Sequence, residues 1–321
     1  MELVAGDIGG THARFAIATI GDGRITLSHM AKLKVAEHAS LQTAFAAWAD
    51  GLGRPLPTQA GMAVAAPVDQ ELIRMANNPW LIRPAMIAER LELERVTLVN
   101  DFAAVAHAVA VGYGDDLAHV CGPDRALADA RVISVIGPGT GLGVAILLPG
   151  GRPRVVPTEG GHIDFAPLDS LEDRLLLQLR QQFRRVSVER IVSGPGLVAI
   201  HGALAAIESR AVPSRADSAL WADAIAGSDT LAVAALDRWF LTFGAVAGDL
   251  ALAQGADTVV LAGGVTPRVA HLFGQSGFHS RFVAKGRFEA RMQTIPVWRS
   301  THPEPGLLGA AAAHLAAGDG S

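Results

Sequence analysis

The 321-residue chain carries a net charge of −4 and is half apolar, with few aromatic residues. Its length favours two domains over one. Nucleic-acid-binding proteins need a basic surface, so the acidic balance and the lack of a dense Lys/Arg run argue against such a partner. The single cysteine, Cys121, excludes an intramolecular disulfide and a multi-cysteine metal site.

The chain start, Met1-Glu2-Leu3, lacks the positive segment and cleavage signal of a secreted protein. No apolar run approaches the ~20 residues that a membrane span requires. We therefore expect a cytoplasmic protein that has no membrane partner.

The first third of the chain alternates apolar strands with glycine turns. We expect strands over residues 3–8, 13–18, 25–35, 61–65 and 96–99, a helix from an N-cap at Ser40 to residue 50, and a helix over 103–111. The pattern then restarts, with strands over 132–136 and 143–148. Further helices are expected over 171–184, 196–208 and 219–226, the last followed by a long helical stretch to 253. A strand over 259–262, a helix that begins at 266 and a terminal helix over 305–317 complete the chain.

An apolar strand, a turn that carries Gly and Thr, and a returning strand thus occur twice, around Thr11 and Thr140. This repeat predicts two related halves that face a cleft. We place the first domain at residues 1–111 with 303–321, and the second at 112–302.

The first glycine turn, Gly6-Asp7-Ile8-Gly9-Gly10-Thr11, joins two strands, whereas a Rossmann or Walker A loop opens a helix. Without Cβ atoms, glycines let phosphate oxygens approach backbone N–H groups, and Thr11 adds a hydroxyl. Asp7 could hold Mg²⁺. Ordinary β-hairpins are the alternative, but the second turn, with Gly139-Thr140-Gly141, and a third at Gly263-Gly264 favour phosphate binding.

Asn100-Asp101 stands where an apolar strand ends and a helix begins. The pair can be a simple helix cap. It can also serve phosphoryl transfer, with Asp101 accepting the proton of an attacking hydroxyl and Asn100 binding a neighbouring sugar hydroxyl.

Glu159-Gly160-Gly161-His162 places a carboxylate and an imidazole on one glycine turn, where both could bind a vicinal diol. The alternatives are a solvated Glu159 and a locally hydrogen-bonded His162. Metal binding is weaker, because no second His or Cys stands at ligand spacing. Glu189 alone is typical of an exposed helix residue.

These motifs together resemble the bacterial glucokinase family of the hexokinase/actin-like superfamily. The matching segments follow the family's order over nearly the whole chain: residues 6–11 with Arg14, 100–102, 137–143, 159–167, 189–190, 193–197, 262–265 and 305–309. The resemblance implies an α/β, actin-like (ribonuclease H-like) fold of two domains with a duplicated mixed-sheet core and an interdomain cleft.

The resemblance further implies ATP-dependent phosphorylation of glucose to glucose 6-phosphate, with Asp101 as the general base. It assigns glucose hydroxyls to Asn100, Glu159, His162 and Glu189, and Asn77 could line the sugar pocket. Residues expected to contact ATP are Gly6, Asp7, Ile8, Gly9, Gly10, Thr11, Gly139, Thr140, Gly141, Gly263 and Gly264, with Mg²⁺ reached from Asp7 through water or phosphate. Similar enzymes are homodimers, and we expect the same here.

Two positions depart from the family pattern, His12 where asparagine is common and Asn78 where histidine is common. The zinc motif of the related repressor/kinase group needs several cysteines, which this chain lacks. Three other functions stay open: a kinase of the same fold for another hexose or amino sugar, a non-catalytic sugar-responsive regulator, and an ATPase without a sugar substrate.

Overall fold

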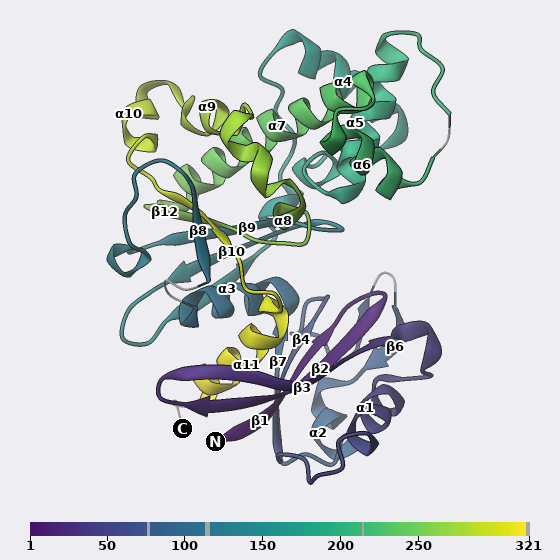
Figure 1. The fold of residues 1–321 in the computed structure, drawn as a ribbon, viewed down its shortest axis with the longest axis vertical. Coiled ribbons are helices and arrows are strands. Elements are labelled where there is room, and N and C mark those ends of the chain that lie inside the picture. The colour runs from purple at the N-terminus through teal and green to yellow at the C-terminus, as the bar shows by residue number, and fades with distance from the viewer. Residues whose placement is uncertain (76–77, 113–115, 214, 319–321) are drawn as a thin grey trace. The chain divides into compact units, whose positions relative to one another are not determined.

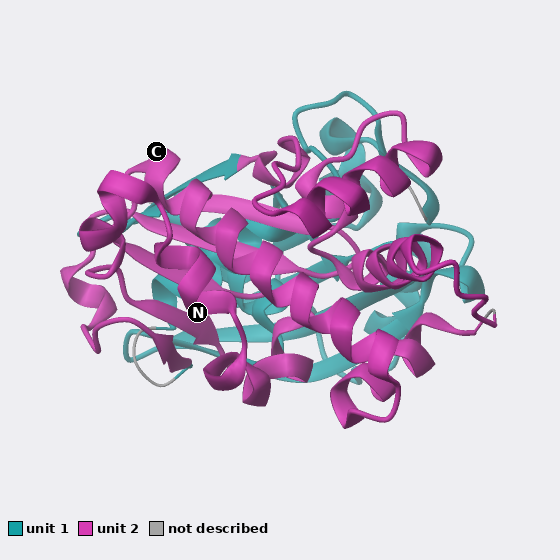
Figure 2. Ribbon diagram, turned by 90° about the horizontal axis from the view of Figure 1, so that it is seen from above, with its two compact units in different colours: residues 1–116, 147–157, 302–321 teal, residues 117–146, 158–301 magenta. Residues whose placement is uncertain are grey.

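The computed structural model describes residues 1–75, 78–112, 116–213 and 215–318 (Figure 1). The chain forms two compact units, coloured separately in Figure 2. Unit 1 consists of residues 1–116, 147–157 and 302–321, and unit 2 of residues 117–146 and 158–301.

Unit 1 is built on a five-stranded mixed sheet of order β3-β2-β1-β4-β7. β1 pairs antiparallel with β2, and β2 with β3, while β4 runs parallel to both β1 and β7. The strand bounds are β1 Glu2–Ile8, β2 His12–Gly21, β3 Arg24–Lys34, β4 Gln59–Val64 and β7 Arg95–Asn100. Between β4 and β7 in the chain, the strands β5 Ile73–Met75 and β6 Asn78–Ile82 form a separate antiparallel two-stranded sheet.

The helices of unit 1 cover its sheet with apolar side chains. α1 (Leu41–Asp50) begins with a capping box formed by Ser40 and Thr43. Its Trp48 stacks on Phe15 of β2, and its Phe45 meets the same ring edge-to-face. α11 (Pro305–Gly318) contributes Leu307 and Ala311 to a cluster with residues of β1 and β2. α3 (Asp101–Val111) packs beside α11, as Figure 1 shows, and the short helices are η1 Val35–Glu37, η2 Pro84–Met86 and α2 Ile87–Arg90.

The second sheet has six strands in the order β11-β10-β9-β12-β13-β8. β12 runs parallel to β9 and β13, and β8 pairs antiparallel with β13. The strand bounds are β8 Leu117–Cys121, β9 Ile133–Pro138, β10 Leu142–Leu148, β11 Arg154–Thr158, β12 Thr258–Leu261 and β13 Val297–Ser300.

The helices of unit 2 surround a core that centres on the 25-residue helix α7 (Thr230–Gln254). Its Trp239 and Phe243 are fully buried among other aromatic rings. The other helices are α4 Ser170–Gln182, α5 Gly194–Ile207, α6 Asp217–Ala226, α8 Thr266–Val269, α9 Phe278–Val283 and α10 Glu289–Met292, with shorter 3-10 turns at 127–129, 160–162, 188–190, 270–275 and 286–288.

The expectation that no apolar run is long enough to span a membrane was wrong in one respect. Helix α7 is long and apolar enough by composition, but 72% of its most apolar window is buried inside the protein. Core helices of globular proteins pass the same test. The burial of α7 therefore accounts for its hydrophobicity.

The two sheets share one strand plan, which confirms the predicted duplication. Read from one edge, β3, β2 and β1 of the first sheet correspond to β11, β10 and β9 of the second. The next two strands, β4 and β7 in the first sheet and β12 and β13 in the second, run parallel to β1 and β9, respectively. The extra strand β8 extends only the second sheet. The expected domain boundaries and the cleft stay predictions, because a compact unit is not by itself an independently folding domain.

Candidate active site

One edge of the unit 1 sheet gathers three candidate segments. Ile8 of β1 pairs with Val64 of β4, which in turn pairs with Asn100 of β7. Because all three strands are parallel, the Gly9–Thr11 turn, the Ala65-Ala66 segment and Asp101 leave the sheet at the same edge. Ligands of α/β sheets bind at the carboxyl ends of parallel strands. This edge of unit 1 is therefore a candidate site, which we call the acid half-site.

The turn from β1 to β2 is held at both ends by hydrogen bonds. Gly9 donates its N–H to the carbonyl of His12 at 2.9 Å, and Val35 donates to the carbonyl of Thr11 at 3.0 Å. Asn78, which is buried, donates from Nδ2 to the carbonyl of Gly9 at 2.9 Å. The turn is thus fixed through its carbonyl groups. The Thr11 side chain is exposed.

The Asp7 side chain is largely buried in unit 1, where it pairs with Arg14 and lies beside Gly306. Its Oδ2 accepts a hydrogen bond from Arg14 Nη1 at 2.8 Å, and the Arg14 Nε lies 3.5 Å from Glu304. A Cβ added at Gly306 would come within 2.7 Å of the same Oδ2 atom, so a side chain there would displace the Asp7 carboxylate. Burial raises the pKa of Asp7 above its ordinary value, while the Arg14 charge acts in the opposite direction.

Asn100 and Asp101 begin helix α3. The Asn100 Oδ1 accepts hydrogen bonds from the N–H groups of Phe102 at 3.0 Å and Ala103 at 3.1 Å, which is the N-cap that the sequence offered as an alternative. The cap occupies the acceptor of Asn100, and its Nδ2 group lies 3.4 Å from the carbonyl of Ala66. Asp101 Oδ1 accepts from the N–H of Phe102 at 2.8 Å. Both side chains are therefore oriented by the first turn of the helix.

Unit 2 contains a second group of candidate residues, which we call the amide half-site. The turn between β9 and β10 is closed by the N–H of Gly139, which donates to the carbonyl of Gly141 at 2.8 Å. Gly194 donates to the carbonyl of Gly139 at 2.7 Å, and Val265 donates to the carbonyl of Pro138 at 3.0 Å. Three glycine turns, around 139, 194 and 263, therefore meet.

Gly263 has to be glycine for two reasons. Its backbone has a φ of +77°, and an added Cβ would come within 2.5 Å of the carbonyl oxygen of Pro138. The neighbouring Ser193-Gly194 segment is fixed by indole groups, since Trp239 donates to the carbonyl of Ser193 at 3.1 Å and Trp221 to that of Gly194 at 2.9 Å. This close backbone packing suits a group that binds phosphates through main-chain N–H groups.

Glu159 and His162 lie on a single 3-10 turn, and their side chains are exposed by 76% and 56%. His162 Nδ1 lies 3.5 Å from Glu159 Oε2. Close packing accounts for a glycine between them. Gly161 is buried, and an added Cβ would overlap the carbonyl oxygen of Leu142.

Glu189 is bound to the glycine turn rather than exposed on a helix. Its Oε2 accepts a hydrogen bond from the N–H of Leu142 at 2.9 Å. The preceding Val188 donates its N–H to the carbonyl of Ile163 at 2.9 Å, so the segments around Glu189 and His162 run side by side. Unit 2 thus brings Glu159, His162 and Glu189 together with the turn at Gly139–Gly141.

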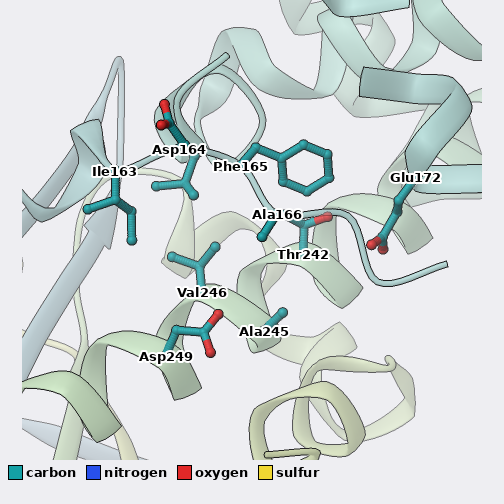
Figure 3. Close-up of a pocket in the computed structure, with 10 residues that line it drawn as sticks. Ile163, Asp164, Phe165, Ala166, Glu172, Thr242, Ala245, Val246 and Asp249 are labelled. Atoms are coloured by element: carbon teal, nitrogen blue, oxygen red, sulfur yellow. The ribbon is translucent and has the colours of Figure 1, made fainter. Parts of the chain in front are cut away.

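A small pocket lies next to the amide half-site without including its candidate residues. Figure 3 shows Ile163, Asp164 and Phe165 on one side and Thr242, Val246 and Asp249 of helix α7 on the other. Two of its carboxylates already have partners: Glu172 accepts from the N–H of Leu168, and Asp249 pairs with Lys285. We therefore assign no ligand to this pocket.

The sequence did not identify several residues that support these half-sites. Arg14 matched the family pattern, but its pairing with Asp7 did not follow from spacing. Gly194 and Leu142 act through backbone groups, for which only the glycine-rich run around 194 gave a signal. Arg185 donates to the carbonyl of His162 at 2.8 Å, and nothing in the sequence pointed to it. The predicted residue Asn77 lies outside the described residues.

Known proteins resemble the chain over nearly its whole length. The glucokinase family model matches residues 4–317. A glucokinase from Zymomonas mobilis is 57% identical over 316 residues, which cover 98% of each chain. The crystal structure of a glucokinase from an Antarctic psychrotroph superposes with a TM-score of 0.85 at 30% identity and covers 98% of each chain.

A ROK family glucokinase from Streptomyces griseus, solved in complex with glucose and AMPPNP, has the same fold, with a TM-score of 0.65 at 21% identity over 98% of this chain and 99% of that one. These likenesses, together with the duplicated sheets, confirm the actin-like α/β fold. Because both the family model and the Zymomonas relative span nearly the entire sequence, the chain belongs to the glucokinase family.

Proposed function

We propose that this protein is a glucokinase that transfers the γ-phosphoryl group of ATP to the 6-hydroxyl group of glucose. One observation carries the proposal: Asp101 and the Gly9–Thr11 turn leave the same edge of parallel strands, where Ile8, Val64 and Asn100 are in register. A carboxylate is thereby available to the 6-hydroxyl group of glucose, and a glycine turn to the phosphates of ATP.

In this proposal Asp101 is the general base. As the 6-hydroxyl oxygen bonds to the γ-phosphorus, its proton passes to the Asp101 carboxylate, the bond from phosphorus to the β-phosphate oxygen breaks, and ADP leaves. The hydrogen bond from the N–H of Phe102 to Asp101 Oδ1 orients this carboxylate at the start of helix α3. Asn100 has its acceptor engaged in the helix cap, so it would donate from Nδ2 to a sugar hydroxyl.

Glu159, His162 and Glu189 would hold the remaining glucose hydroxyls. A site that hydrogen-bonds hydroxyl groups rejects sugars that lack them, because its polar groups would be left unpaired. The exposed Glu159 and His162 side chains lie 3.5 Å apart, a separation that allows them to address adjacent hydroxyls. Selection of the sugar is thus assigned to this group of side chains.

The two glycine turns would hold the nucleotide through backbone N–H groups other than those of Gly9 and Gly139, which donate within their own turns. Gly139, Thr140 and Gly141 belong to one turn and residues 6–11 to the other, while Gly263 and Gly264 are assigned to the adenosine. The ROK family glucokinase from Streptomyces griseus, which has the same fold, was solved with glucose and AMPPNP, and this supports ATP as the donor. Lysine is not needed, since amide groups and Thr hydroxyls supply the donors.

Asp7 fits a role toward Mg²⁺ through water better than direct ligation. Its Oδ2 is engaged by Arg14 at 2.8 Å, and no cluster of three or more His, Cys, Asp or Glu side chains suited to a metal occurs among the described residues. Phosphate oxygens would therefore supply most ligands of the ion. When bound, Mg²⁺ offsets the negative charge of the phosphates.

A coupled assay of ADP release against a panel of hexoses tests the proposal. We expect the highest kcat/KM for glucose with ATP. Preferential turnover of mannose, fructose or an amino sugar would replace glucose as the substrate, and ADP release independent of sugar would indicate an ATPase. Binding of glucose without turnover would indicate a regulator. Light scattering and cell fractionation test the homodimer and the cytoplasmic location that we also propose.

A further inference from the structure

The Glu189 carboxylate is in direct contact with the turn at Gly139–Gly141, which we call the nucleotide turn. Its Oε2 accepts from the N–H of Leu142 at 2.9 Å, and Leu142 follows Gly139-Thr140-Gly141 directly in sequence. A Cβ added at Gly141 would overlap this same Oε2 atom and come within 3.1 Å of Cδ. The carboxylate therefore occupies the space that a side chain at position 141 would need.

The segment that carries Glu189 anchors the turn at a second point. Gly194, five positions further along, donates its N–H to the carbonyl of Gly139 at 2.7 Å. Glu189 and Gly194 thus hold opposite ends of the same three-residue turn. A shift of the segment 189–194 would change the orientation of the N–H groups that we assign to phosphate.

The same segment and the same peptide also support the sugar residues. Val188 donates its N–H to the carbonyl of Ile163 at 2.9 Å, just after His162. The carbonyl oxygen of Leu142 lies against Gly161, at a distance that excludes any side chain there. Leu142 therefore contacts Glu189 through its N–H group and the Glu159–His162 turn through its carbonyl group.

We propose that Glu189 positions the nucleotide turn and thereby couples occupation of the sugar site to binding of ATP. This inference rests on the proposed function. Oε2 holds the turn, while Oε1 has no hydrogen bond within the described part of the chain and is available to a sugar hydroxyl. A sugar that fixes the carboxylate through Oε1 also fixes the Leu142 peptide, so each ligand increases the affinity of the other.

Calorimetric titration of AMPPNP with Mg²⁺, with and without saturating glucose, measures this coupling. We expect glucose to tighten AMPPNP binding to the unmodified protein by at least about fivefold. Glu189→Ala should abolish this enhancement. Glu189→Gln should restore it in large part, since an amide oxygen can still accept from the Leu142 N–H. Equal coupling in the unmodified protein and in Glu189→Ala would overturn the proposal.

His162→Ala is the matched control for loss of sugar contacts alone. Within the described residues, no hydrogen bond or ion pair joins His162 to the turn at Gly139–Gly141. Its removal should therefore weaken glucose binding, while AMPPNP without glucose binds within about twofold of the unmodified protein. By contrast, Glu189→Ala should weaken AMPPNP binding even without glucose, because the turn loses its anchor. Unchanged AMPPNP affinity in Glu189→Ala without glucose would make Glu189 a sugar ligand only.

Two glycine substitutions test the coupling from the other side. Gly141→Ala should weaken glucose binding by at least about fivefold, because the new Cβ displaces the Glu189 carboxylate. Gly139→Ala, in the same turn, is the control: nothing in the described structure lies within 4 Å of its added Cβ, and its glucose affinity should stay within about twofold. Equal glucose affinity of the two variants would contradict the inference.

These outcomes separate the inference from the proposed function. An unmodified protein that releases no ADP with glucose refutes the proposed function, whatever the variants do. An active protein whose Glu189 and Gly141 variants keep normal nucleotide and glucose binding, respectively, refutes the coupling alone. Circular dichroism spectra verify folding, and Gly141→Ala provides an independent test if Glu189→Ala does not fold.

Discussion

Gly309 of helix α11 lies directly against the backbone of Ala104 in helix α3, with no room for a side chain between them. An added Cβ at position 309 would overlap the Ala104 carbonyl oxygen. Because α3 begins with Asn100 and Asp101, the C-terminal helix of the chain positions the helix that carries the proposed base. The contact therefore links the stability of unit 1 to its acid half-site.

We expect Gly309→Ala to lower the free energy of unfolding by about 1–3 kcal/mol, because the helices have to separate to admit the methyl group. Urea unfolding followed by circular dichroism measures this change. Gly202→Ala in helix α5 is the control: nothing in the described structure lies within 4 Å of its added Cβ, so alanine should be neutral or stabilise by up to ~1 kcal/mol. Equal midpoints for the two variants would contradict close packing at Gly309.

Asp101→Asn should reduce kcat by at least ~10²-fold, the low end for removal of a general base. The variant should still bind glucose, since an amide oxygen can accept the N–H of Phe102 as the carboxylate does. Steady-state kinetics and calorimetry measure the two quantities. Asp173→Asn, an exposed carboxylate in the first turn of α4, is a matched control and should leave kcat unchanged. Near-normal turnover of Asp101→Asn would exclude it as the base.

Glu159→Gln and His162→Ala should each raise the KM for glucose by about tenfold or more, the effect of losing a hydrogen bond to a charged or strongly polar partner. The KM for ATP should change much less for Glu159→Gln and His162→Ala. Initial rates at varied glucose and fixed ATP, and the reverse, measure both constants. An unchanged KM for glucose would indicate that the exposed pair is a solvated surface turn.

Asp229 gives a stability effect with a defined pH dependence. It caps helix α7, and the hydrogen bond from Arg215 lowers its pKa to about 2. A lowered carboxylate pKa contributes stability that is present above the ordinary value near 3.8 and is lost as the pH falls toward 2. Asp229→Asn keeps a cap but removes the charge, and should cost about 1 kcal/mol at pH 7 after screening by solvent. The difference from the unmodified protein should narrow at pH 3, and urea unfolding at both pH values measures it; a constant difference would contradict the ion pair.

His314 should make unit 1 less stable in mild acid. The ring is buried, its Nδ1 lies 3.0 Å from Thr97 Oγ1 and its Nε2 2.8 Å from Gln59 Oε1, and burial lowers its pKa. Because the unfolded chain takes up a proton that the folded protein disfavours, stability falls as the pH drops below 6.5. His314→Gln should be less stable at pH 7 by about 1–3 kcal/mol.

The slope of stability against pH between 6.5 and 5 is the diagnostic measurement for this histidine. It should be shallower in His314→Gln than in the unmodified protein. Part of the slope should persist, since the pKa values of His107 and His201 are also lowered by burial. Identical slopes would show that His314 takes up its proton equally well in the folded state.

The sequence predicted the elements whose apolar residues recur at a regular spacing or whose ends are marked by a helix cap or a glycine turn. The helix after Ser40 was recognised from its cap, and the strands flanking Thr11 and Thr140 from their glycine turns. Strands β11 and β13 were missed because each has few residues and several partly exposed ones, so their hydrogen bonds come from neighbours that only the fold supplies. The β5-β6 hairpin was missed for the same reason.

The candidate site was predictable where its chemistry stands beside a turn. Asn100-Asp101 at a strand end and Glu159 with His162 around two glycines gave local signals. Glu189 gave none, because its partner is a backbone amide 47 positions away in sequence. The need for Gly161 and Gly263 likewise comes from carbonyl oxygens of distant segments, which no local pattern encodes.

The two sheets share one strand plan but differ in the residues that follow corresponding strands. Strand β7 ends in Asn100 and is followed by an acid, whereas its counterpart β13 ends in Ser300 and is followed by Thr301. Both sheets have a glycine turn, after β1 and after β9, but only the first sheet has a carboxylate directly after its last parallel strand. The two sheets therefore share a plan and differ at the ends of their strands, and changes at Ser300 should reduce activity far less than changes at Asp101.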